Sequence, residues 1–159
     1  MADNFQAALA YVYDDEGLKY EDVPGDKGGP TKFGITHIDL DRWRDFIKES
    51  RADVHSLTRE EAALIYETFY WQELGCNALP AGLDYCAFDL GVNSGVARSH
   101  RYLAESNGTP AERIIQICDR RAKFLTALAE HPSQLKFKRG WLNRVTNVKA
   151  RALAMAKGK

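Results

Sequence analysis

The sequence predicts a mainly α-helical fold of about seven helices with a small β or loop part near the N-terminus, about residues 17–36. Three observations predict it: apolar residues recur at helical spacing along most of the chain, two capping boxes mark helix starts, and one short stretch is rich in glycine and proline turns. A chain of 159 residues with 45% hydrophobic residues can bury its own core. We therefore expect residues 1–159 to form a single domain, in which the C-terminal helices, about 109–157, complete the fold.

The first helix is predicted to run from a cap at Asp3 to Glu16. Its apolar residues fall on one face: Phe5, Ala8, Leu9 and Val12. Gly17 offers the left-handed backbone that ends a helix. A carboxylate in the last turn faces the negative end of the helix dipole, which favours the protonated form that a general acid needs.

Residues 18–36 are the only β region that the sequence predicts. Short apolar alternation runs through it: Tyr20, Val23, Phe33 and Ile35. Pro24-Gly25 and Gly28-Gly29-Pro30 divide it with turns. We expect two or three short strands or an irregular loop.

Helical spacing resumes over residues 37–48. The capping box Thr58-Arg59-Glu60-Glu61 predicts the start of the next helix. That helix should run to Trp71 and end by Gly75, because glycine readily adopts the left-handed conformation of a helix stop.

The segment from Leu83 to Val92 is mostly apolar on all sides, which predicts a buried helix. Asn93-Ser94-Gly95 should end it, because these residues favour a break in the helix. Another helix is predicted from there to about Glu105.

A second capping box lies at Thr109-Pro110-Ala111-Glu112, with proline at the first helical position. It predicts a helix through Leu128. The last helix should begin near Phe137 or Gly140 and run to about Met155, because helical apolar spacing continues there.

Charge is unevenly distributed, although the net charge is zero. Acids dominate the first thirty residues, whereas no acid follows Glu130. The bases after that residue are Lys136, Lys138, Arg139, Arg144, Lys149, Arg151, Lys157 and Lys159. This segment reads either as a solvated basic helix or as a surface for weak contact with polyanions.

The sequence excludes several kinds of site. The three cysteines are far apart among apolar residues, which predicts buried free thiols and no disulfide framework: Cys76, Cys86 and Cys118. The four histidines lack the spacing of zinc ligands, and neither a P-loop nor a GxSxG motif occurs. We expect no metal, no cofactor and no nucleic-acid partner.

What remains is a set of carboxylates near a glycine-rich turn, which is what glycoside hydrolysis requires. Glu16 is the candidate general acid. For the second carboxylate the residues leave Asp26 and Asp22 open, since a polar loop keeps an aspartate ionised. Thr31 could hold a water against the sugar. On spacing alone the pattern is not specific to a catalytic site, because acids commonly cluster in solvated surface loops, and that interpretation is the favoured one at this point.

The same stretch resembles the opening of the glycoside hydrolase family 108 endolysins and muramidases. Two elements carry this resemblance, Glu16-Gly17-Leu18-Lys19-Tyr20 and Gly28-Gly29-Pro30-Thr31-Lys32-Phe33-Gly34-Ile35-Thr36. Further similar segments follow in the same order: Tyr66 to Trp71, Phe88-Asp89-Leu90-Gly91-Val92-Asn93-Ser94-Gly95, and Gly140-Trp141-Leu142-Asn143-Arg144. The stretch is similar, more loosely, to bacteriophage-type lysozymes, in which a Glu, an Asp and a Thr form the site.

The resemblance implies a lysozyme-like fold and hydrolysis of the β-1,4 bond between N-acetylmuramic acid and N-acetylglucosamine in peptidoglycan, causing bacterial lysis. It implies Glu16, Asp26 and Thr31 as the catalytic residues, and we expect inversion through a water that Thr31 positions. We place four residues at the substrate: Tyr20, Asp22, Asn93 and Ser94. We expect Trp141 and Arg144 to serve packing and a structural charge pair. A retaining mechanism stays open, because it differs only in the separation of the carboxyl groups.

A monomer acting on peptidoglycan glycan strands is the expected form. The basic C-terminal helix is expected to add weak electrostatic contact with an anionic wall or outer-membrane lipid. The N-terminus shows no basic and apolar signal segment, so we expect synthesis in the host bacterial cytoplasm and action on the wall after release. Two other classes remain open: a lytic transglycosylase that forms anhydro-muropeptides, and a non-catalytic wall-binding or secretion-accessory protein.

Overall fold

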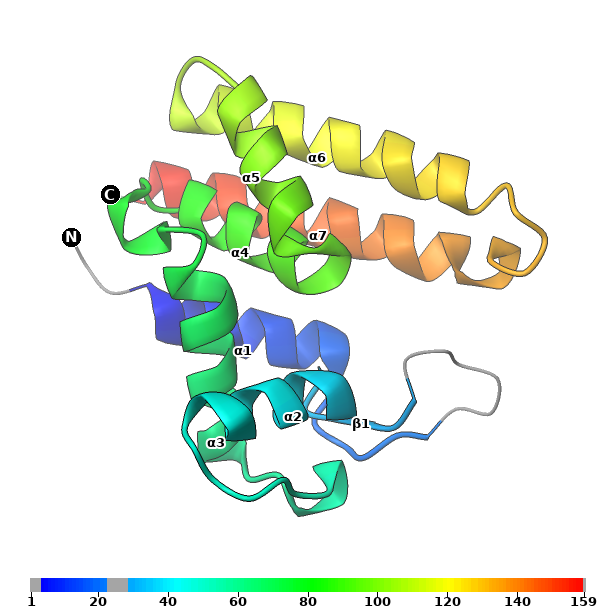
Figure 1. Cartoon of the computed structure of the whole chain (residues 1–159). Helices are drawn as coiled ribbons and strands as arrows, with labels where there is room; N and C mark the ends of the chain where they lie inside the picture. Colours follow the sequence, from blue (N-terminus) through cyan, green and yellow to red (C-terminus); the bar gives the residue numbers. More distant parts are fainter. Residues whose placement is uncertain (1–3, 23–28, 159) are drawn as a thin grey trace. The chain divides into compact units, whose positions relative to one another are not determined.

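The computed structural model describes residues 4–22 and 29–158. The chain forms two compact units, an N-terminal unit, Phe5–Phe69, and a C-terminal unit that contains Asn4 and the chain from Tyr70 onward. The described residues form seven α-helices and one two-stranded sheet (Figure 1), which confirms the predicted mainly α-helical, lysozyme-like class. That residues 1–159 act as a single domain stays a prediction.

Helix α1 (Phe5–Glu16) opens the N-terminal unit and buries the predicted face: Phe5, Ala8, Leu9 and Val12. It ends as predicted, because Gly17 takes a φ of 84° and its N–H donates to the Tyr13 carbonyl at 2.8 Å. The expected cap, Asp3, lies outside the described residues.

The predicted β region forms a small antiparallel hairpin. Strands β1 (Thr31–Lys32) and β2 (Ile35–Thr36) pair with Thr31 opposite Thr36, and an isolated bridge joins Glu21 to Thr31. Phe33 and Gly34 form the turn with φ of 54° and 77°. Two successive positive φ values match the twist that a two-residue hairpin needs. Val23, Pro24 and the other residues of 23–28 lie outside the described part of the chain.

The other elements that begin in this unit are α2 (His37–Phe46), η1 (Val54–Ser56), α3 (Arg59–Tyr66) and the π-helical stretch η2 (Glu67–Gln72). Threonine side chains start both α-helices. Thr36 accepts from the Asp39 N–H at 3.2 Å, and Thr58 accepts from the Glu61 N–H at 3.1 Å. The second of these contacts supports the start predicted from the capping box.

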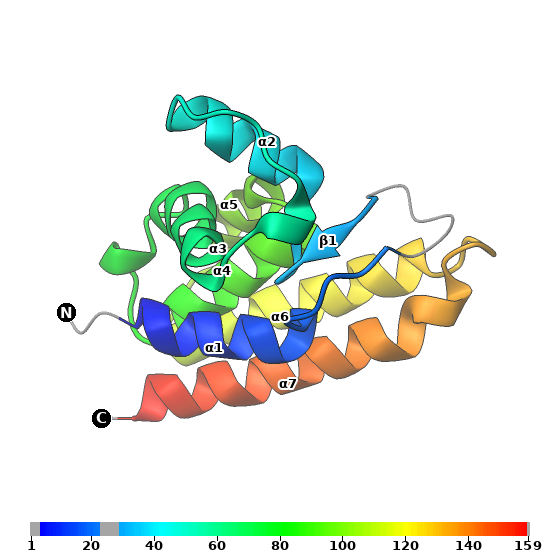
Figure 2. The ribbon, with the colours of Figure 1, turned by 90° about the horizontal axis from the view of Figure 1, so that it is seen from below.

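The C-terminal unit contains η3 (Cys76–Ala78), α4 (Leu83–Ser94), α5 (Val96–Glu105), α6 (Pro110–Leu128), η4 (Leu135–Phe137) and α7 (Lys138–Lys157). Helix α4 is its central element, since every residue from Leu83 to Gly91 is buried. Helices α6 and α7 lie side by side along their length (Figures 1 and 2). The predicted capping box is complete: Thr109 accepts from the Glu112 N–H at 3.2 Å, and the Glu112 carboxylate accepts from the Thr109 N–H at 2.7 Å.

All three cysteines are buried free thiols, as predicted: Cys76, Cys86 and Cys118. The sulfur atoms of Cys86 and Cys118 lie 3.8 Å apart between α4 and α6. In the described part of the chain, none of the helices has both the length and the apolar character needed to cross a membrane.

Candidate active site

Glu16 is the last residue of α1, and the β1–β2 turn rests on the stem of its half-buried side chain. A methyl group placed on Gly34 would lie 2.9 Å from Cβ of Glu16 and 2.5 Å from the hydroxyl oxygen of Tyr66. Both distances are shorter than van der Waals contact, so only a residue without a side chain fits here. The hairpin turn and the end of α1 are therefore in direct contact.

Aromatic side chains fix this turn from the inside of the N-terminal unit. The Tyr66 hydroxyl donates to the Phe33 carbonyl at 2.7 Å. The ring of Tyr13, one turn before Glu16, lies edge-on to Tyr66 at 5.9 Å and tilted against Phe33 at 6.2 Å. Burial raises the pKa of Tyr13 to about 12, although the nearby Arg59 opposes the shift. The phenol therefore stays neutral at physiological pH and packs as an aromatic support for the site.

Thr31 lies on the hairpin and is held by its backbone. Its N–H donates to the Glu21 carbonyl and its carbonyl accepts from the Glu21 N–H, both at 2.8 Å. Its side chain is half-buried. These bonds restrain the backbone of the strand that carries the predicted water-binding threonine.

Tyr20 is 38% exposed, and its ring lies 4.7 Å from the ring of His55. Lys32 donates to the His55 carbonyl at 2.8 Å, so η1 is attached to the hairpin beside Tyr20. An exposed aromatic ring such as that of Tyr20 can stack on a sugar. His55 was not among the predicted site residues, because a lone histidine 35 positions away carries no local signal.

Only one of the two candidates for the second carboxylate lies in the described part of the chain. Asp22 is described and exposed, whereas Asp26 lies outside the described residues. The choice between them stays a prediction, as does the inverting mechanism.

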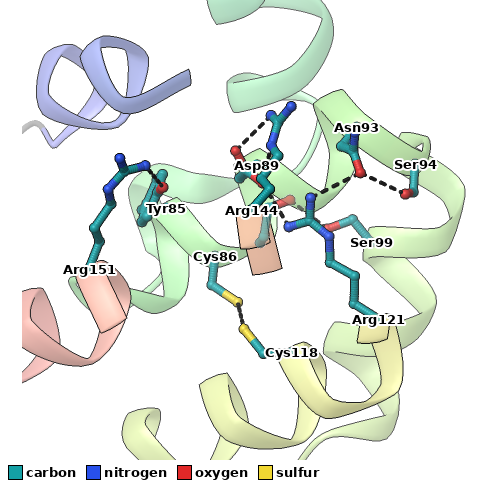
Figure 3. Close-up of polar contacts among 11 residues, drawn as sticks. Tyr85, Cys86, Asp89, Asn93, Ser94, Ser99, Cys118, Arg121, Arg144 and Arg151 are labelled. Atoms are coloured by element: carbon teal, nitrogen blue, oxygen red, sulfur yellow. Dashed lines mark hydrogen bonds and ion pairs between the residues drawn. The ribbon is translucent and has the colours of Figure 1, made fainter. Parts of the chain in front are cut away.

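Asn93 and Ser94 lie at the C-terminal end of α4, in the C-terminal unit. The Asn93 carbonyl oxygen accepts from the Arg121 guanidinium at 3.0 Å and from the Ser94 hydroxyl at 3.3 Å (Figure 3). Both residues are half-buried.

A buried ion cluster lies beside Asn93 (Figure 3). Asp89 is fully buried and accepts from Arg121 at 2.7 Å and from Arg144 at 2.9 Å. Burial alone would raise the pKa of Asp89, but the two guanidinium groups outweigh it and hold this pKa below its ordinary value. The predicted structural charge pair of Arg144 is confirmed. The sequence carries a signal for this ion cluster, because Asp89 is an acid within an apolar run and a buried acid must be paired.

Among the described residues, no group of three histidine, cysteine or acidic side chains is placed to hold a metal. The sequence pattern described as Glycosyl hydrolase 108 matches residues 9–95, which include both Glu16 and Asn93. The chain belongs to the glycosyl hydrolase 108 family.

A solved structure supports this membership. The chain is 33% identical to the protein in "Structure of Brucella abortus SagA", over 98% of this chain and 97% of that chain, with a TM-score of 0.83. No curated protein matches the chain. This glycosyl hydrolase 108 chain is thus a glycoside hydrolase.

Proposed function

We propose that this glycosyl hydrolase 108 protein is a peptidoglycan-degrading endolysin, an N-acetylmuramidase. It hydrolyses the β-1,4 bond between N-acetylmuramic acid and N-acetylglucosamine and so lyses bacterial cells. The observation that carries the proposal is Glu16, which ends α1 directly beneath the glycine turn of the hairpin within the family match. A carboxyl group fixed at this place is suited to protonate a glycosidic oxygen.

In the proposed mechanism, Glu16 donates its proton to the leaving oxygen as the bond to the sugar carbon breaks. A second carboxylate, Asp26, stabilises the positive charge at that carbon and takes a proton from a water that Thr31 holds. The water oxygen adds to the opposite face, so the configuration inverts. Asp22 is the alternative to Asp26, and a retaining route would need carboxyl groups about 5–5.5 Å apart instead of about 6.5–9.5 Å.

Matched variants separate the two second carboxylates. We expect Asp26→Asn to lose most of the activity on purified peptidoglycan and Asp22→Asn to keep most of it. The reverse result would move the role to Asp22. NMR of the first products reads the stereochemistry, because inversion of a β bond releases the α anomer and retention releases the β anomer.

The protein is proposed to act as a monomer on glycan strands, after synthesis in the host bacterial cytoplasm and release to the wall, as in a bacteriophage lysis system. The basic face of α7 adds a weak contact with an anionic wall or outer-membrane lipid. In α7, Lys149 pairs with the exposed Asp119 at 2.9 Å and Arg151 lies 3.4 Å from the Tyr85 hydroxyl. The Asp119 carboxylate is exposed, so its ion pair with Lys149 is weak and leaves the lysine charge accessible to a polyanion.

A further inference from the structure

The amide of Asn93 has one favoured orientation. Its oxygen accepts two hydrogen bonds, from the Arg121 guanidinium at 3.0 Å and from the Ser94 hydroxyl at 3.3 Å. A guanidinium carries donors only, so the flipped amide would place its own N–H groups against those of Arg121. The Nδ2 group therefore faces away from Arg121.

Arg121 cannot turn away from this contact. Its side chain is 1% exposed, and its other terminal nitrogen donates to the fully buried Asp89 at 2.7 Å. Asp89 is held in turn by Arg144 from α7 at 2.9 Å. The Nε atom of Arg121 is buried and has no partner among the described residues. The fold thus keeps the guanidinium between Asp89 and Asn93 even though one hydrogen bond is left unmade.

The Nδ2 group of Asn93 is available to a molecule outside the protein. No described residue accepts a hydrogen bond from it, and it is not among the enclosed polar atoms that lack a partner. Because Nδ2 carries two N–H donors and no acceptor, the ligand atom that meets it must be an acceptor.

Resting on the proposed function, we infer that Arg121 is a positioning residue that holds Asn93 as a donor to the acetamido carbonyl oxygen of an N-acetylated sugar. The hydroxyl groups of a glycan both donate and accept, whereas an acetamido carbonyl only accepts. A hydroxyl oxygen can also accept from Nδ2, but the amide carbonyl oxygen is the stronger acceptor, so the acetamido group is the favoured partner of this fixed donor. The Asp89–Arg121–Arg144 cluster sets specificity at Asn93, besides joining α4, α6 and α7.

The first test is Asn93→Asp, which removes the Nδ2 donor. One carboxylate oxygen still accepts from Arg121 and Ser94, and the second takes the place of Nδ2. We expect the affinity for a soluble β-1,4 oligomer of N-acetylglucosamine to fall about tenfold or more, as for one lost hydrogen bond. Affinity for the matching glucosamine oligomer, which lacks the acetyl groups, should not fall. Equal affinity of wild type and Asn93→Asp for the acetylated oligomer would overturn the inference.

The second test asks whether Arg121 acts through Asn93. Arg121→Lys keeps a positive charge for Asp89, but a single ammonium cannot reproduce the fork that reaches both partners. On peptidoglycan we expect a raised KM, little change in kcat, and a reduced preference for acetylated over de-N-acetylated strands. In an Asn93→Ala background, Arg121→Lys should then cause no further loss. Additive losses in this double-mutant cycle would contradict a positioning role.

Ser99→Ala is the matched control for stability. Ser99 is fully buried and donates to the Ala87 carbonyl of α4 at 2.7 Å, but no recorded bond joins it to Asn93 (Figure 3). It should lower stability and leave the acetyl preference unchanged. If the wild-type protein binds the oligomer with this preference but does not cleave peptidoglycan, only the proposed function is rejected. If the wild-type protein cleaves peptidoglycan but folded Arg121→Lys keeps the full acetyl preference, only the role of Arg121 is rejected.

Discussion

Gly34→Ala tests whether the hairpin turn holds Glu16 in place. Gly34 has a φ of 77°, and an added methyl group would meet the Tyr66 hydroxyl at 2.5 Å and Cβ of Glu16 at 2.9 Å. Left-handed backbone costs alanine about 1–2 kcal/mol. Overpacking against two fixed side chains adds about 1–3 kcal/mol. We therefore expect the free energy of unfolding to fall by roughly 2–5 kcal/mol.

Gly75→Ala is the matched control. Gly75 has a similar φ of 65°, but nothing lies within 4 Å of an added methyl group. It should cost only the backbone strain of about 1–2 kcal/mol. Urea unfolding measures both variants. Lysis of purified walls is then measured where both are fully folded, and we expect Gly34→Ala to lose about tenfold or more, because small misplacements of a catalytic group are costly. A Gly34→Ala protein as stable and as active as Gly75→Ala would refute this reasoning.

Three other predictions follow from the described residues. Asp89→Asn should lower the free energy of unfolding by roughly 3–5 kcal/mol, because it leaves buried guanidinium charge uncompensated. The folded pKa of Asp89 lies below its unfolded value of about 3.9, so the extra stability of the wild type over Asp89→Asn is complete above pH 3.9 and is lost as the pH falls through the folded pKa. Urea unfolding of both proteins at pH 7 and at pH 2–3 measures this difference in stability. An equal difference at the two pH values would contradict the prediction. The thiols should resist a disulfide reagent until the protein unfolds, since burial raises the pKa of Cys76 to about 12 and all three are buried: Cys76, Cys86 and Cys118. Wall binding should weaken and lose its salt dependence when four bases near the C-terminus are neutralised: Lys149, Arg151, Lys157 and Lys159, of which the last lies outside the described residues. Unchanged cosedimentation with walls would remove the role of these bases.

Local signals in the sequence predicted the helix boundaries well. Gly17 ends α1 and Thr109 starts α6, because a helix stop and a capping box depend on residues within one turn. The buried helix α4 was predictable from its continuous apolar run. In α2 the apolar spacing predicted the helix but not which residues are covered: Leu40 is fully buried, whereas Ile38 and Phe46 are each 62% exposed.

The supporting contacts of the site could not be predicted, because they join residues far apart in the chain. Gly34 meets Glu16 and Tyr66 only once the hairpin has folded over the end of α1. Likewise, Arg121 reaches Asn93 across 28 residues. A motif names the residues that do chemistry, but the residues that hold them depend on tertiary packing.

Glu16 as the general acid is the central claim, and one incubation tests it most directly. Purified peptidoglycan is treated with wild type and with folded Glu16→Gln, and the products are analysed by mass spectrometry. We predict hydrolysed muropeptides with reducing N-acetylmuramic acid ends from the wild type and none from Glu16→Gln, because the amide cannot donate an acidic proton. Anhydro-muropeptides from the wild type would contradict hydrolysis, and retained cleavage by Glu16→Gln would contradict the role of Glu16.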